Sequence, residues 1–212
     1  MSKDHLLTAA FMLFVTSLVI HWREAPSAVT RNEWQPILQS LRHECDPANP
    51  EADYSFVQTA LPTERKRVAL LQRCLDLGPG LLPLIKDALQ HETDEEVHGM
   101  LTVFAAALGD TESIEPAARC MTGHDFPALK ITAAKALRPI RDPMLTPWFR
   151  LALEDWHFVV NGACGIERER FYPVRSIAAQ ALVARNLIAE TDAELEKRRH
   201  SEIKEREILR TN

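Results

Sequence analysis

Two nine-residue stretches, LKITAAKAL at 129–137 and VRSIAAQAL at 174–182, carry the clearest pattern in the chain. In the first stretch, Leu129 is followed by apolar residues at offsets of 4, 7 and 8, and Val174 is followed by apolar residues at the same offsets in the second. This spacing places the apolar side chains on one stripe of an α-helix, whereas a half-buried strand would need strict alternation. A looser copy of the same stripe begins at Val97.

A proline marks the segment that precedes each of these copies. Pro83, Pro116 and Pro147 lie 33 and 31 residues apart, and each has an apolar residue two positions before it and another five positions after it. A period of 20 to 50 residues is typical of stacked helical units that each bury a face only against a neighbour. The sequence therefore predicts an all-α fold, a right-handed α-solenoid of about four helical hairpins.

The paired motifs resemble the HEAT-like repeat of phycobilin lyases and related α-solenoids, in which a proline-marked helix precedes a Val-Arg-x-x-Ala-Ala-x-Ala-Leu helix. The resemblance covers residues 80–187 and implies the repeat architecture, but these repeats serve many unrelated roles and imply little about function. Before them, residues 25–79 are expected to form a linker and a degenerate capping repeat around Pro36. After them, residues 188–212 are expected to form a charged C-terminal helix.

Residues 1–24 are predicted to anchor the chain in a membrane. Residues 6–22 contain no Asp, Glu, Lys or Arg, and as a helix they would span about 25 Å, just short of a hydrocarbon core of about 30 Å. A buried soluble helix and a cleaved signal peptide are the alternatives; the first would show a polar face, and the second would need small residues where Arg23 and Glu24 stand. The predicted single-pass anchor comprises Leu6, Phe11, Leu13, Phe14, Val15, Leu18, Val19, Ile20 and Trp22.

The charges that flank this segment specify its orientation only weakly. Lys3 and the amino terminus precede it, and Arg23 and Arg31 follow it, so the positive-inside rule does not choose a side. The short N-terminal tail favours an amino terminus on the inside. In a bacterium, this orientation would place the solenoid in the periplasm.

The composition argues against several classes of function. The net charge of −5 and the isoelectric point near 5.9 provide no basic footprint for nucleic acid. The sequence contains no glycine-rich phosphate loop and no Cys-x-x-Cys pair, which argues against nucleotide and zinc sites, and we predict neither a metal nor a cofactor. Cys74 and Cys120 are expected to be buried thiols, and a disulfide between Cys45 and Cys164 would require their two loops to meet.

Two His-Glu pairs leave an enzymatic alternative open. His43-Glu44 and His91-Glu92 resemble the pairs with which deoxyhypusine hydroxylase, a HEAT-like enzyme, binds a di-iron centre. Here the pairs are 48 residues apart, which is not a multiple of the repeat, although metal ligands must converge on one centre. A metal-dependent hydroxylase or a lyase-like enzyme is therefore the alternative function.

An insertion at 154–172 is the predicted partner-binding site. Leu129 to Val174 is 45 residues, whereas Val97 to Leu129 is 32, so about 13 extra residues lie in the last unit. Insertions in solenoids gather on one face, often the binding face, and Trp, Tyr and Arg are enriched where interface energy concentrates. The alternative is that the aromatic residues cap the exposed end of the stack. The candidate contacts are Trp156, Phe158, Arg168, Arg170 and Tyr172.

Together these features predict a non-enzymatic, membrane-anchored scaffold that binds another protein. One version is an accessory subunit whose N-terminal helix packs into a membrane complex. The expected partners are a membrane-associated protein and the lipid bilayer, and nucleic acid is not among them.

Overall fold

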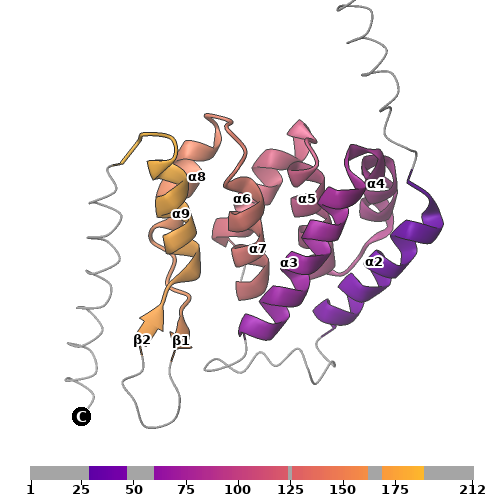
Figure 1. Cartoon of the computed structure of the whole chain (residues 1–212), viewed down its shortest axis with the longest axis horizontal. Helices are drawn as coiled ribbons and strands as arrows, with labels where there is room; N and C mark the ends of the chain where they lie inside the picture. Colours follow the sequence, from indigo (N-terminus) through magenta and orange to yellow (C-terminus); the bar gives the residue numbers. More distant parts are fainter. Residues whose placement is uncertain (1–28, 47–59, 124–125, 162–168, 189–212) are drawn as a thin grey trace, which may run out of the picture.

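The computed structural model describes residues 29–46, 60–123, 126–161 and 169–188 of the 212-residue chain. This part is almost entirely helical, which confirms the predicted all-α class. Short 3-10 turns at Pro79–Leu81 and Thr111–Ser113 lead into two of the helices. With the labels of Figure 1, the eight α-helices of the described residues are α2 (Arg31–Cys45), α3 (Ala60–Leu77), α4 (Leu82–His91), α5 (Glu95–Ala107), α6 (Ile114–Gly123), α7 (Pro127–Leu137), α8 (Leu145–Ala152) and α9 (Pro173–Val183).

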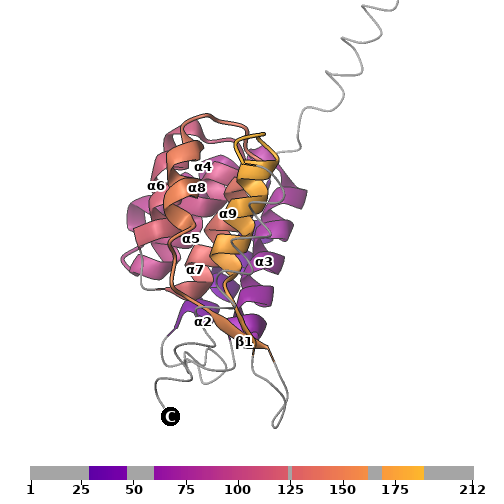
Figure 2. The ribbon, with the colours of Figure 1, turned by 90° about the vertical axis from the view of Figure 1, so that its left-hand side faces the viewer.

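Consecutive helices pair along the long axis of the molecule (Figure 1). α4 packs against α5, α6 against α7 and α8 against α9, and contacts between α5 and α7 and between α7 and α9 join the pairs. From the side, α8 lies with α4 and α6, whereas α9 lies on the side of α3 (Figure 2). The core is therefore built between neighbouring pairs, where the apolar stripe of each helix is covered.

The pair α2–α3 is placed differently from the three pairs that follow it. Two ion pairs connect α2 with α4 and with the residue that follows α4. Arg31 pairs with Asp87 at 3.7 Å, and Arg42 pairs with Glu92 at 2.9 Å. α3, by contrast, packs mainly against α7 and much less against α5. As a result, α5 has neighbours on several sides, and ten of its thirteen residues are buried. A helix that is apolar almost all round is typical of such a position.

The apolar stripes predicted from the sequence form the core. The first residues of the three stripes, Val97, Leu129 and Val174, are buried, and so are the apolar residues at offsets of 4, 7 and 8 from each. At an offset of 11 from Leu129, Ile140 is partly exposed. These side chains belong to one continuous cluster that runs from α2 to α9. Burying a Leu, Ile or Val side chain fully is worth about 1.5–3 kcal/mol. The apolar residues around the three prolines are buried as well: Leu81, Ala88, Ile114, Met121, Leu145 and Ala152.

Local signals set the helix ends. Gly78 has a φ of 73°, and its N–H donates to the carbonyls of Cys74 and Leu75, so α3 ends at this glycine. At the start of α5, Asp94 is the N-cap, and its side chain accepts the N–H of Val97 at 2.9 Å.

The insertion contains a short β-ribbon that the sequence did not predict. β1 (Val159–Asn161) pairs with β2 (Glu169–Phe171) in antiparallel fashion, with Val159 opposite Phe171. Each strand has only three residues, which is too short for an alternating pattern to stand out. These are the only strands in the part of the chain that the structure describes.

The segment predicted to anchor the chain, residues 1–24, lies outside the described residues. Within the described ranges, no single helix is long and apolar enough to cross a bilayer. By length and composition alone, one bent pair of helices could cross a bilayer when both are taken together. This pair is Arg65–Leu77 and Pro79–His91, with a bend of 99° between them. The single-pass anchor stays a prediction from the sequence.

Gly99→Ala is expected to destabilise the fold by about 1–3 kcal/mol. A Cβ at this position of α5 would lie 2.7 Å from Cδ2 of Leu129, a side chain of α7 that is itself completely buried. Gly123→Ala, at the exposed end of α6, is the matched control, because its Cβ would meet nothing within 4 Å. Urea denaturation of both variants measures the difference. Equal midpoints would show that α5 and α7 do not approach each other this closely.

Candidate protein-binding site

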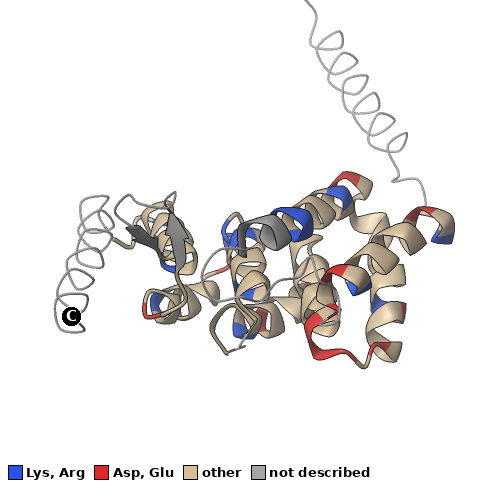
Figure 3. Ribbon diagram, turned by 90° about the horizontal axis from the view of Figure 1, so that it is seen from below, with Lys and Arg blue, Asp and Glu red and all other residues tan. Residues whose placement is uncertain are grey.

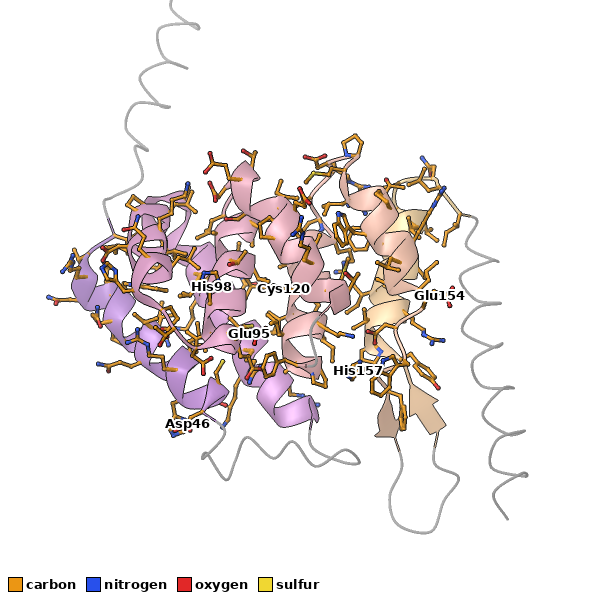
Figure 4. All side chains as sticks on the ribbon, turned by 180° about the vertical axis from the view of Figure 1, so that it is seen from behind. Asp46, Glu95, His98, Cys120, Glu154 and His157 are labelled. Atoms are coloured by element: carbon orange, nitrogen blue, oxygen red, sulfur yellow. The ribbon has the colours of Figure 1, made fainter. Side chains whose placement is uncertain are left out.

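The insertion leaves the helices at one edge of the molecule. The chain departs after α8, forms the β1–β2 ribbon beyond that edge, and returns at Pro173 to start α9 (Figure 1). The C-terminal end of α2 and the N-terminal end of α3 lie at the same edge. Asp46, which follows α2, and His157, which lies in the insertion, are both found toward this edge (Figure 4). The segment between α2 and α3 and the insertion at 154–172 thus leave the helices along one edge.

A buried ion pair fixes the start of the insertion to α7. Nζ of Lys130 lies 2.5 Å from Oδ2 of Asp155, and both side chains are almost completely buried. The other carboxylate oxygen of Asp155 accepts the backbone N–H of His157 at 3.0 Å. Such a pair is strongly destabilised when one partner is lost, because the remaining charge has no compensation. The first residues of the insertion are therefore fixed to α7 by a buried ion pair.

The electrostatics of Asp155 reflect both its burial and its partners. Burial raises the pKa of a carboxyl group, but hydrogen bonds from His157 and Lys130 and the charge of Lys130 outweigh it, so the pKa of Asp155 is lowered. The carboxylate is consequently ionised at neutral pH. Nδ1 of His157 lies 3.2 Å from Nζ of Lys130 and 3.4 Å from Oδ1 of Asp155, so the imidazole belongs to the same cluster.

The second basic residue at this site comes from the equivalent position of the next motif. Arg175 is the second residue of VRSIAAQAL, as Lys130 is of LKITAAKAL. Its Nε donates to the backbone carbonyl of Asp155, and its guanidinium lies 4.6 Å from the centre of the Tyr172 ring. Asp155 is thus held from α7 and from α9 by residues at the same position of the two nine-residue stretches. Sequence reasoning missed both; the signal was a basic residue repeated at the second motif position beside an acidic residue in the insertion.

The structure separates the predicted contact residues into two groups. Phe158 and Tyr172 are half-buried, and their ring centres lie 5.9 Å apart, so they pack within the base of the insertion. Trp156 instead is 56% exposed and stacks on the imidazole of His157, with ring centres 4.2 Å apart. Arg170 lies in β2 opposite Val160. Arg168 lies outside the described residues.

A second buried ion pair stabilises the same edge. Arg67 of α3 is completely buried, pairs with the carboxylate of Glu96 of α5, and donates from Nη2 to the carbonyl of Glu44 of α2 at 2.8 Å. In the sequence, Leu71, Cys74 and Leu75 stand at offsets of 4, 7 and 8 from Arg67, so the arginine occupies the first position of an apolar stripe. The edge also carries charge on its surface, since the turn between α4 and α5 is acidic and a basic run, residues 65–67, lies in the first half of α3 (Figure 3).

The two His-Glu pairs lie near the ends of α2 and α4, and their carboxylates have cationic neighbours. Glu92 is paired with Arg42 at 2.9 Å, and Glu44 lies 3.2 Å from Nζ of Lys66. Within the described ranges, no group of three or more His, Cys, Asp or Glu side chains is placed to hold a metal ion.

The cysteines that the structure describes, Cys45, Cys74 and Cys120, are free and buried, which confirms the expected burial of the last two. Burial raises the pKa of Cys45 and Cys74 to about 12 and that of Cys120 to about 11. These thiols are therefore not activated as nucleophiles. Cys164, the predicted partner of a possible disulfide with Cys45, lies outside the described residues.

Comparison of the chain with protein-family models, curated proteins and solved structures found no match. The candidate site is therefore defined by its geometry. It consists of the exposed indole of Trp156, the His157 ring beneath it, and the buried Lys130–Asp155 pair that fixes both to the helices.

Proposed function

We propose that this chain is a HEAT-like repeat scaffold that binds another protein through the insertion at 154–172. Trp156 carries the proposal, because its large aromatic side chain is exposed yet held in one orientation by its stack on His157. A pre-positioned tryptophan loses little side-chain entropy on binding and offers a large apolar area, which is why tryptophan is enriched at interface hot spots. A segment used only as a cap would instead turn this ring toward the helices.

The repeat interpretation rests on the three proline-marked pairs α4–α5, α6–α7 and α8–α9. Their packing partners follow the order of the chain, and Lys130 and Arg175 occupy equivalent places in two successive units. We assign these pairs to a right-handed α-solenoid, with α2–α3 as a first, atypical unit. In such stacks, loops inserted at one edge are free of the packing demands of the repeat.

The membrane-anchored form of the scaffold rests on the sequence of residues 1–24. In this version, the anchor packs into a membrane complex and the helices cover the soluble face of that complex, on the periplasmic side in a bacterium. An accessory subunit of this kind needs a rigid contact surface and no chemistry of its own.

Trp156→Ala is expected to weaken partner binding by about 2 kcal/mol, or about thirtyfold. The free energy of unfolding should change by no more than about 0.5 kcal/mol, because the side chain is exposed. The partner is first identified by co-purification with the tagged full-length chain from its native membranes. The purified partner is then titrated against each variant, and thermal melting is recorded on the same samples.

Leu75→Ala is the matched control for this experiment. Leu75 lies on α3 and is 40% exposed, so its replacement by alanine removes an exposed apolar side chain from a helix away from the insertion. Its affinity should equal that of the unaltered chain. If Trp156→Ala lowers the melting temperature while the folded fraction binds normally, the insertion is a cap and the contact surface lies on the helices.

A further inference from the structure

Three arginines gather at the end of α9 that lies away from the insertion. Arg138 follows α7, and its Nη1 donates to Oε1 of Gln180 at 2.8 Å. Arg141 lies in the turn between α7 and α8, and its Nη1 donates to the backbone carbonyl of Ala184. Both acceptors belong to the last turn of α9 and the residue after it. Both arginines are exposed, so their remaining N–H groups face water.

The third arginine is held between the same two helix ends. Arg185 donates from Nη1 to the carbonyl of Ala181 at 2.8 Å and from Nη2 to the carbonyl of Ile140. Its guanidinium lies 4.6 Å from the centre of the Phe149 ring. Burial lowers the pKa of Arg185, and the positive charge of Arg141 lowers it further, because the two guanidinium groups lie near each other. The three arginines therefore form one cluster with fixed side chains.

The local charge of this arginine cluster is not balanced. Two helix C-termini carry about −0.5 elementary charge each, and the neighbouring Asp142 contributes one negative charge, against three positive charges. None of the three arginines forms an ion pair with a carboxylate of the residues that the structure describes. Other cations of the described part do form such pairs, among them Arg42–Glu92, Lys86–Asp110, Arg119–Glu115 and Lys130–Asp155. The cluster thus retains an excess of positive charge.

Exposed apolar side chains flank the arginine cluster. Met144 follows Arg141 by three residues and is 38% exposed, and Leu187 follows Arg185 by two residues and is 39% exposed. We propose that the cluster and these two side chains form a docking surface for an acidic segment of a partner polypeptide. Guanidinium groups bind carboxylates through charge-assisted, often bidentate, hydrogen bonds. The apolar flanks fit the side chains of a peptide, and the chain's net charge of −5 disfavours nucleic acid.

This docking surface is separate from the one assigned to the insertion. The insertion joins α9 at its N-terminal end, whereas the arginines lie at its C-terminal end. A helix of 11 residues is about 16 Å long. A partner could engage both ends of α9 at once, and variants at one end leave the other intact.

The surface is tested with the full-length chain in detergent and a fluorescein-labelled, twelve-residue peptide that carries four glutamates and one leucine among serines. Fluorescence anisotropy is expected to show binding that weakens as salt is raised, and no binding of the peptide with glutamine in place of glutamate. Arg138→Gln combined with Arg141→Gln should weaken binding about tenfold or more, since it removes two charge-assisted contacts.

Arg31→Gln combined with Arg73→Gln is the control of equal charge, because both residues are exposed and lie on α2 and α3, away from α9. Its affinity should stay within about twofold, and Trp156→Ala should bind the peptide normally even if the insertion does not bind the partner. Equal weakening by both double variants would overturn the proposal, and so would competition by inorganic phosphate at the same concentration as the peptide. If the peptide binds only to a variant that carries Glu190→Gln, Asp192→Asn and Glu194→Gln together, the chain's own tail occupies this surface. That result would overturn the assignment to a partner.

Discussion

Glu96→Ala is expected to lower the free energy of unfolding by about 3–5 kcal/mol, more than any other single substitution considered for this fold. The change removes this carboxylate from a guanidinium that is completely buried, while Nη2 of Arg67 still donates to the carbonyl of Glu44 at 2.8 Å. Arg67 lies within α3, and its side chain is covered by α2 and α5, so it has no short route to water. Urea denaturation with a shared slope measures the loss.

Two further variants distinguish the ion pair from the helix position. Glu95→Ala removes a carboxylate from the same first turn of α5, but Glu95 is exposed, and the expected cost is about 0.5 kcal/mol. Arg67→Met combined with Glu96→Leu removes both charges and should recover most of the stability that Glu96→Ala loses. If Glu96→Ala and Glu95→Ala prove equally mild, the pair is not buried in solution.

The sequence predicted most of the helical core because the relevant information is local. The stripe that starts at Val97, Leu129 or Val174 is fixed by the 3.6-residue period of the helix, and its burial follows from that period alone. Gly78 was equally predictable, since a helix end with positive φ strongly favours glycine. Both predictions depend on neighbours within one or two turns.

What the sequence did not predict depends on which helices meet. Arg67 interrupts an apolar stripe, and only the arrival of Glu96 from α5 makes its burial tolerable. The preference of α3 for α7 over α5 is a long-range arrangement of helices, for which the sequence has no short-range signal. The same holds for the candidate site, because Asp155 is defined by its two basic neighbours, Lys130 and Arg175, from separate helices.

The candidate contacts illustrate the same division. The sequence placed Trp156, Phe158 and Tyr172 in one insertion, and all three are aromatic. Only the structure shows that two of these rings pack together while Trp156 faces solvent on His157. Composition identifies the segment, whereas the direction of each side chain depends on the anchor at Asp155.

Lys130→Met is expected to cost about 3 kcal/mol at neutral pH, the lower end of the range for breaking a buried ion pair. Asp155 lies outside the helices, so its carboxylate can move toward water more easily than the guanidinium of Arg67 can. The ring stack of Trp156 on His157 depends on this anchor, so partner binding should weaken as well. Lys135→Met, a less buried lysine of the same helix, is the control and should change stability by about 0.5 kcal/mol.

The pH dependence tests the mechanism behind this loss. The pKa of Asp155 is lowered in the folded chain, so its contribution to stability is present above the unfolded value of about 3.9 and is lost as the pH falls through the folded value. Protonated Asp155 would leave Lys130 as a buried cation in the unaltered chain, whereas the Lys130→Met variant holds no such charge. The stability gap between the two proteins should therefore narrow in urea denaturation as the pH is lowered from 7 to below the unfolded value of about 3.9. A gap that stays constant over this range would show that Lys130 acts through the packing of its aliphatic stem and not through its charge.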